Sequence, residues 1–189
     1  MRTLKKSLCL VLALVFFLGL CTIGAGAAFT DADEIHYEEA VNVMTELGIL
    51  AGYEDGSFAP TKSVKRSEAA KMITYMILGA ENAERLPVSA TFTDVPTSAW
   101  YAKYVSFCVS KGIINGYGDG TFGPDKPVTG IQLAKMLLVA IGYGCMDEFQ
   151  GAGWDVNVFA EAISAGVYND STVADFTAPA TREECALYV

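Results

Sequence analysis

Two arginines stand at the same place in related segments, 65–68 (KRSE) and 181–184 (TREE). Arg66 and Arg182 are each expected in the first turn of a helix, where the helix dipole disfavours a cation by roughly 0.3 to 1 kcal/mol. A guanidinium fork beside exposed helix-start amides can bind a carboxylate or a phosphate. The alternative is a surface ion pair with an acid of a neighbouring element. In either case we expect Arg66→Ala to leave the fold nearly intact.

Two tryptophans and a group of lysines extend this candidate site. Trp100 and Trp154 open predicted helices, and their flat rings suit either sugar stacking or packing between units. Lys65 and Lys71, with Lys62, lie close in sequence to Arg66. The candidate ligand-binding residues are therefore Arg66, Arg182, Trp100, Trp154, Lys65 and Lys71.

Other chemistries find little support in the sequence. Asp55 and Asp119 each supply one carboxylate to an Asp-Gly turn, far fewer oxygen ligands than calcium requires. His36 is the single histidine, which disfavours a histidine-based metal or catalytic site. Adjacent acids in a helix point in different directions, and neither a nucleophile elbow nor a phosphate loop is present. We expect no cofactor, no metal and no catalysis within these residues, although a longer parent protein could carry a catalytic domain.

The elements that hold these residues come from an internal repeat. Residues 48–72 and 112–136 align without a gap at an offset of 64, with 13 of 25 positions identical. A third, altered copy follows, because Trp154 precedes Gly166 by 12 residues, just as Trp100 precedes Gly112. Such a period indicates stacked units that bury each other's apolar faces.

Each copy reads as a helix, a glycine-rich loop and a second helix. Gly48 and Gly112 end the first helices, where a left-handed cap is expected. Thr129 with Gln132, and Thr181 with Glu184, have the spacing of capping boxes at the second helices. The apolar positions expected to face neighbouring units are Tyr37, Ala40, Val41, Met44, Leu47, Tyr101, Tyr104, Val105, Cys108, Ala69, Met72, Ile73, Met76, Ile77, Leu133, Met136, Leu137, Ala140 and Ile141.

The amino terminus has the parts of a secretory signal peptide. Three basic residues precede an apolar run over 8–21 that is too short to span a bilayer, and small residues follow. We predict cleavage after Ala27; a lipoprotein reading would use Cys21. Cleavage would leave 10 basic and 22 acidic residues, a net charge of −12, which disfavours nucleic-acid binding. Cys108, Cys145 and Cys185 would remain, and buried free thiols are favoured over one internal disulfide.

These motifs together resemble an array of S-layer homology domains. The resemblance rests on Phe-Thr-Asp, the helix-opening Trp, Gly-Ile-Ile-x-Gly-Tyr-x-Asp-Gly-Thr-Phe-x-Pro and the Thr-Arg-Ala-Glu type motif, and it covers nearly all of the mature chain. It implies a mostly α-helical fold of three helix-loop-helix repeats in a pseudo-threefold array. The predicted boundaries are 1–27 for the signal peptide, 28–87 for repeat 1, 88–147 for repeat 2 and 148–189 for repeat 3, which stops early in its second helix.

The resemblance also implies a function. Grooves between repeats of this family bind acidic secondary cell-wall polysaccharide, often through a pyruvylated amino sugar, so a cell-wall anchor without a membrane span is expected. Gly130, however, replaces the motif arginine of repeat 2, and His36 and Lys65 replace the Trp and cap Thr of repeat 1. The groove at Gly130 is therefore expected to be weak, and Gly130→Arg to strengthen it. The alternatives are a surface-layer assembly protein that uses protein contacts, or the anchoring part of a wall-remodelling enzyme.

Overall fold

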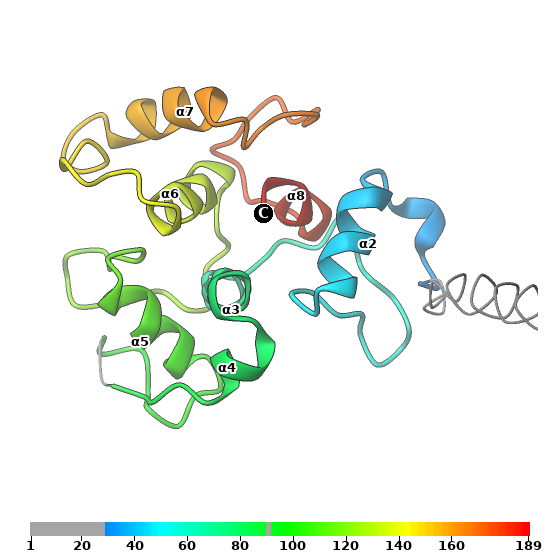
Figure 1. Cartoon of the computed structure of the whole chain (residues 1–189), viewed down its shortest axis with the longest axis horizontal. Helices are drawn as coiled ribbons and strands as arrows, with labels where there is room; N and C mark the ends of the chain where they lie inside the picture. Colours follow the sequence, from blue (N-terminus) through cyan, green and yellow to red (C-terminus); the bar gives the residue numbers. More distant parts are fainter. Residues whose placement is uncertain (1–28, 90–91) are drawn as a thin grey trace, which may run out of the picture.

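The computed structural model describes residues 29–89 and 92–189, and the predicted signal peptide lies outside these ranges. The described residues are mostly helical, with a short 3-10 helix η1 (Ala32–Glu34) followed by seven α-helices (Figure 1). These are α2 (Glu38–Glu46), α3 (Arg66–Leu78), α4 (Ala80–Glu84), α5 (Ala102–Ser110), α6 (Gly130–Ala140), α7 (Trp154–Ser164) and α8 (Arg182–Tyr188). Among them, none is long and apolar enough to cross a membrane.

A closed ring of main-chain hydrogen bonds joins the three repeats. The amide of Val64 donates to the carbonyl of Ala180, that of Ala180 to Val128, and that of Val128 to Val64, at 2.9 to 3.0 Å. Isolated bridges flank this ring, namely Ser63 with Thr181, Lys65 with Pro127 and Thr129 with Pro179. Equivalent residues of each repeat thus meet around one axis, which confirms the pseudo-threefold array.

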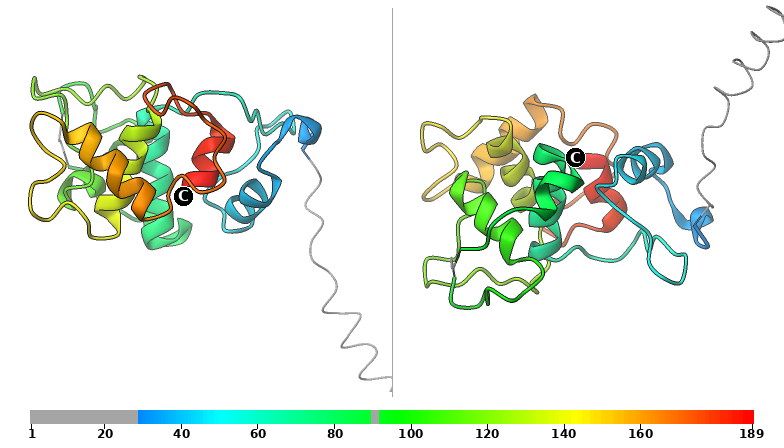
Figure 2. Two further views of the ribbon diagram at one scale, coloured as in Figure 1. Left: turned by 90° about the horizontal axis from the view of Figure 1, so that it is seen from above. Right: turned by 60° about the horizontal axis from the view of Figure 1, so that its bottom comes forward.

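The helices follow the same symmetry. The second helix of each repeat, α3, α6 or α8, lies near the axis, and the first helix of the next repeat packs against its outside: α5 on α3, α7 on α6 and α2 on α8 (Figures 1 and 2). Because α2 of repeat 1 packs on α8 of repeat 3, the array closes on itself. Each of these three interfaces between an inner and an outer helix therefore joins two different repeats.

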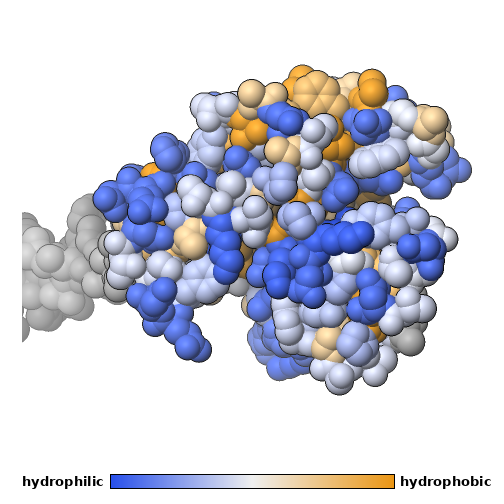
Figure 3. All heavy atoms as spheres, turned by 180° about the vertical axis from the view of Figure 1, so that it is seen from behind, coloured by the Kyte–Doolittle hydropathy of each residue, from blue (hydrophilic) through white to orange (hydrophobic). Residues whose placement is uncertain are grey.

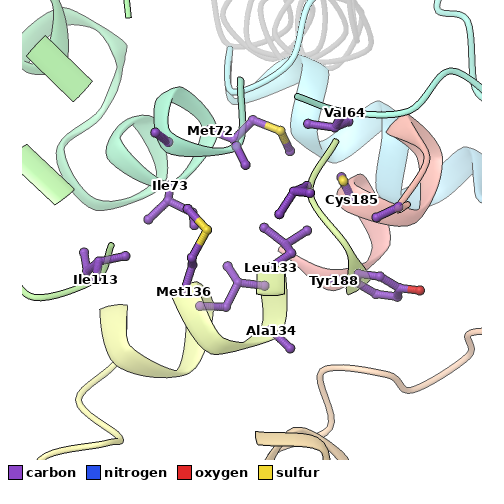
Figure 4. Close-up of a cluster of buried hydrophobic side chains, with 14 of the residues drawn as sticks. Val64, Met72, Ile73, Ile113, Leu133, Ala134, Met136, Cys185 and Tyr188 are labelled. Atoms are coloured by element: carbon purple, nitrogen blue, oxygen red, sulfur yellow. The ribbon is translucent and has the colours of Figure 1, made fainter. Parts of the chain in front are cut away.

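Side chains from the three inner helices fill the centre of the ring (Figure 4). Ala69, Leu133 and Cys185 occupy equivalent positions and are fully buried. The three described cysteines are free thiols, with Cys108 buried and Cys145 exposed. Burial raises the pKa of Cys108 to about 11 and that of Cys185 further, so both thiols stay protonated at neutral pH and act as small apolar side chains.

Some apolar positions that the spacing assigns to the core are exposed. Leu47, Ile77 and Ile141 have exposed fractions of 64%, 39% and 62%. They lie in the last turn or at the C-cap of their helices. Apolar surface also gathers over α7, where Val156 and Ile163 are exposed (upper right in Figure 3).

The glycines that end the first helices are confirmed as left-handed caps. Gly48, Gly112 and Gly166 have φ values of 68°, 70° and 79°. We expect Gly112→Val to destabilise the fold by about 1 to 2 kcal/mol, because a side chain with a Cβ pays that cost in the left-handed region. The measurement is the thermal unfolding of Gly112→Val. The control is Lys111→Val, because Lys111 has a φ of −96° and a valine there is not strained. Equal melting temperatures for the two variants would contradict it.

Candidate functional site

The loops that follow the first helices are fixed by an aspartate from the start of the same repeat. Asp94 accepts hydrogen bonds from the amides of Phe122 and Gly123 at 2.8 and 2.7 Å, and Asp31 does the same for Phe58 and Ala59. The bond from the Phe58 amide is the main reason that the pKa of Asp31 is lowered. These bonds set the direction of the Phe58 and Phe122 carbonyls, which accept from the arginines.

Asp55 and Asp119 have the structural role that turn chemistry predicts. Asp55 accepts from the amide and hydroxyl of Ser57, and Asp119 accepts from the same groups of Thr121. Their carboxylates are thus engaged inside their own turns. No group of three or more His, Cys, Asp or Glu side chains suited to a metal occurs among residues 29–89 and 92–189.

Arg66 is a buried side chain that links repeat 1 to repeat 2. It is only 7% exposed, its Nε donates to the Phe122 carbonyl at 2.9 Å and its Nη1 donates to Gln132 Oε1 at 3.3 Å. The guanidinium lies 5.0 Å from the centre of the Tyr117 ring. Burial lowers its pKa, but arginine remains charged at neutral pH. Within the described part of the chain, Nη2 has no hydrogen-bond acceptor.

Arg182 repeats this arrangement between repeat 3 and repeat 1. It is 8% exposed, and its Nε and Nη2 donate to the carbonyls of Phe58 and Ala51 at 2.8 and 2.9 Å. Its guanidinium lies 4.7 Å from the centre of the Tyr53 ring. The alternative of a surface ion pair is therefore wrong, because each arginine is buried at a repeat interface and donates to carbonyl oxygens there.

The helix-start amides are also engaged, contrary to the expectation that they are exposed. Arg66 N and Ser67 N donate to the carbonyls of Lys126 and Pro124, at 2.9 and 3.1 Å. The equivalent amides of repeat 3 donate in the same way to repeat 1. An anion at this place must therefore be held by cationic side chains. The predicted capping boxes at Thr129 and Thr181 are confirmed.

A cleft of about 300 Å³ opens beside Arg66, and we call it site 1. Gln132 and Lys135 of α6 line it together with Trp154 of α7 and Tyr117 of the repeat 2 loop. Lys135 lies 4.7 Å from the centre of the Trp154 ring, its Nζ donates to the Phe149 carbonyl at 2.6 Å, and burial lowers its pKa. Site 1 thus combines two cations with two aromatic rings.

The repeat symmetry assigns Arg182, Tyr53, Glu68, Lys71 and Trp100 to the position related to site 1, which we call site 2. Trp100 is 54% exposed, and Lys71 Nζ lies 6.0 Å from its ring centre and 4.9 Å from that of Tyr75. The sequence groups Lys71 with Arg66, but the two lie in different sites because they are more than a turn apart on α3. The sequence reasoning missed Lys135, which the repeat offset of 64 from Lys71 identifies.

Lys65 lies outside both sets of residues. Its Nζ pairs with Asp125 at 2.7 Å, and this contact raises its pKa. Lys65 occupies the N-cap position of α3. Its cation therefore faces an acid of repeat 2.

The third related position, site 3, is a cleft of about 580 Å³ with a different lining. Leu187 and His36, which line this cleft, stand where the other sites have lysine and tryptophan. Gly130 stands at the arginine position but is not among the residues that line the cleft. Its lining residues are His36, Tyr37, Glu38, Glu39, Ala40, Asp170 and Leu187, without a lysine or an arginine. The backbone amide of His36 donates to Glu183 Oε2 at 2.7 Å, and the ring Nδ1 of His36 lies 3.2 Å from Glu183 Oε1. Glu183 is 7% exposed.

An arginine at position 130 would crowd the backbone of repeat 3, so the expected gain from Gly130→Arg stays a prediction that requires a shift of this backbone. A Cβ there would lie 3.1 Å from the carbonyl oxygen of Phe176 and 3.3 Å from its Cα. Tyr168 stacks on the Phe176 ring at 3.8 Å and donates a hydrogen bond to the Gly130 carbonyl. Aromatic packing has replaced the arginine at this interface.

Site 2 is supported by Glu84 of α4. Its carboxylate accepts from Lys103, Tyr104 and Tyr75, and these bonds, that of Lys103 first, lower its pKa from 4.5 to about 2. Tyr75 and Tyr104 in turn lie beside Lys71. Glu84 thus fixes two of the rings that surround the Lys71 ammonium.

This lowered pKa predicts a pH dependence of stability. The contribution of Glu84 is present above about pH 4.5 and is lost as the pH falls towards 2. We expect Glu84→Gln to cost about 1 kcal/mol at pH 7, a value reduced for solvent screening of a half-exposed carboxylate, and to cost progressively less below pH 4.5. Urea unfolding from pH 7 to pH 2 measures this. Glu81→Gln, which removes an exposed pair with Arg85, is the control. Parallel pH curves for Glu84→Gln and the unchanged protein would contradict the prediction.

Comparison with known proteins agrees with this architecture. The sequence profile described as "S-layer homology domain" matches residues 28–70 and 91–134. The chain is an S-layer homology domain protein. The two matched ranges include Arg66, Tyr117 and Gln132 of site 1 and Tyr53, Glu68 and Trp100 of site 2. Lys71, Lys135, Trp154 and Arg182 lie outside them, and the third copy completes the same ring.

Relatives of this S-layer homology domain protein include surface proteins of several bacteria. The Surface-layer 125 kDa protein of Lysinibacillus sphaericus is 30% identical over 180 residues, covering 87% of this chain and 15% of that protein. The Cell surface protein of Thermoanaerobacter kivui is 29% identical over 181 residues, covering 92% and 23%. The Cellulosome-anchoring protein of Acetivibrio thermocellus is 35% identical over 87 residues, covering 46% and 20%. The chain spans under a quarter of the length of each.

The family and these relatives place this S-layer homology domain protein at the bacterial cell surface, and they support a role in surface anchoring in general. The names of the relatives indicate structural rather than catalytic proteins.

Proposed function

We propose that this chain anchors an exported protein non-covalently to the cell wall by binding acidic secondary cell-wall polysaccharide at sites 1 and 2. The unit contacted is a pyruvylated amino sugar. The observation that carries the proposal is the cleft of site 1, where the buried Arg66, whose Nη2 has no protein acceptor in the described structure, lies with Lys135 and Trp154. The repeat symmetry assigns the equivalent Arg182, Lys71 and Trp100 to site 2.

The chemistry of a pyruvylated sugar suits these groups. Its carboxylate can accept charge-assisted hydrogen bonds from the arginine and the lysine. Its ring presents C–H groups that can pack on the face of Trp100 or Trp154. Because the mature chain is expected to carry a charge of −12, an acidic polymer is repelled at long range. Binding then depends on these local cations and should weaken as salt rises.

Co-sedimentation with purified cell walls tests this proposal. The folded chain should sediment with intact walls and remain in solution with walls stripped of their secondary polymer. A variant with Trp100→Ala and Trp154→Ala should remain in solution with both. Equal sedimentation with stripped walls would overturn the proposal in favour of contacts with peptidoglycan or with surface-layer protein.

A further inference from the structure

The three related sites differ in charge at one structural position, the third residue of the inner helix. In site 1 this residue is Gln132, whose Oε1 lies 3.3 Å from Arg66 Nη1 and 3.4 Å from the Thr129 amide. In site 2 it is Glu68, whose carboxylate accepts from the Lys65 amide at 2.8 Å. In site 3 it is Glu184, which accepts from the Thr181 amide. The same cap is therefore made by a neutral amide in one site and by a carboxylate in the others.

This exchange changes the charge balance of each site. Site 1 holds the cations Arg66 and Lys135, and no acid is among the described residues that line its cleft. Site 2 holds two cations as well, but Glu68 adds a negative charge. Site 3 has neither cation, and its described lining includes three acids.

Resting on the proposed function, we infer that the three sites form a graded series for an anionic glycan. Site 1 binds most tightly, site 2 binds more weakly and site 3 does not bind. Gln132 and Glu68 are the residues that set the order of the first two. A carboxylate at this position repels the ligand carboxylate. For partly solvated groups one such charge changes affinity by about two- to fivefold.

The chain allows the charge to be changed without changing the helix starts. Glutamate and glutamine both serve the third position of a capping box, so Gln132→Glu and Glu68→Gln keep the cap. A merely structural role for these residues would leave the relative affinities of the two sites unchanged. Glu184→Gln makes the same chemical change in the site without cations and is the matched control.

Each site also carries its own fluorescent reporter, because the chain has two tryptophans, Trp154 in site 1 and Trp100 in site 2. In Trp100→Phe the remaining emission reports site 1, and in Trp154→Phe it reports site 2. Each background is titrated with the methyl glycoside of a pyruvylated N-acetylhexosamine. We expect the dissociation constant at site 1 to be about two- to fivefold lower than at site 2, with the difference shrinking at high salt.

The exchanges should then shift the sites separately. Gln132→Glu should weaken site 1 by about two- to fivefold, Glu68→Gln should strengthen site 2 by a similar factor, and Glu184→Gln should change neither. Equal affinities that neither exchange alters, or tighter binding at site 2, would overturn the grading and leave the proposed function intact. If neither tryptophan responds to the glycoside, the proposed function and the grading both fail.

Discussion

Arg182→Ala is expected to destabilise the protein by about 3 kcal/mol, because it removes two charge-assisted hydrogen bonds from a buried interface. The carbonyls of Phe58 and Ala51 lose their donors, and both belong to repeat 1 while the arginine belongs to repeat 3. This side chain therefore helps to close the ring of repeats, because it joins residues that are 124 or more positions apart in the sequence.

Urea unfolding at neutral pH gives the free energy of unfolding for this test. The control is Arg85→Ala, which removes an arginine of the same size from an exposed pair with Glu81 and should cost well under about 1 kcal/mol. Arg66→Ala should also destabilise the protein, contrary to the expectation from the sequence that it leaves the fold nearly intact, because Arg66 is buried and donates to the Phe122 carbonyl as Arg182 does to that of Phe58. If Arg182→Ala unfolds at the same urea concentration as Arg85→Ala, the arginine does not stabilise the repeat interface.

The second large effect concerns ligand affinity. The double variant Lys71→Ala, Lys135→Ala should lose about 10- to 100-fold in affinity at each site, the range for losing one hydrogen bond to a charged group. Neither lysine belongs to the ring of main-chain hydrogen bonds that joins the three repeats, so the fold should persist. The measurement is calorimetric titration with the pyruvylated glycoside.

A matched pair of lysines controls for net charge. Lys65→Ala, Lys111→Ala removes the same number of cations from positions outside the two sites, and Lys65 is already paired with Asp125. Its affinity should stay within about twofold of the unchanged protein, as expected for exposed charges. Equal losses in the two double variants would show that bulk charge, and not the lysines of the sites, governs binding.

Local sequence signals predicted the repeated elements well. Glycine after an apolar stripe predicted the left-handed caps at Gly48 and Gly112, and the Thr-x-x-Gln spacing predicted the cap at Thr129. These caps depend on residues a few positions apart, so the sequence of a single repeat is enough to predict them. The offset of 64 between copies then predicted that the units share one architecture.

The composition of each site was harder to predict because it depends on which repeats become neighbours. Arg66 meets Lys135 only because the ring places the start of α3 beside α6. Closure of the ring also buries the arginines and pairs the helix-start amides with carbonyls of the neighbouring repeat. The local sequence of one helix start contains no signal for these contacts. Lys65, one residue before Arg66, turns to Asp125 instead. At site 3, Leu187 takes the lysine position, and aligning the third copy with the others reveals the change.

The number of glycosides bound per folded chain tests the central claim most directly. Calorimetric titration with the pyruvylated N-acetylhexosamine glycoside should give two bound per chain, and one per chain after either Lys71→Ala or Lys135→Ala at concentrations that saturate only the intact site. Three per chain, or two per chain that neither substitution reduces, would contradict the assignment of binding to sites 1 and 2.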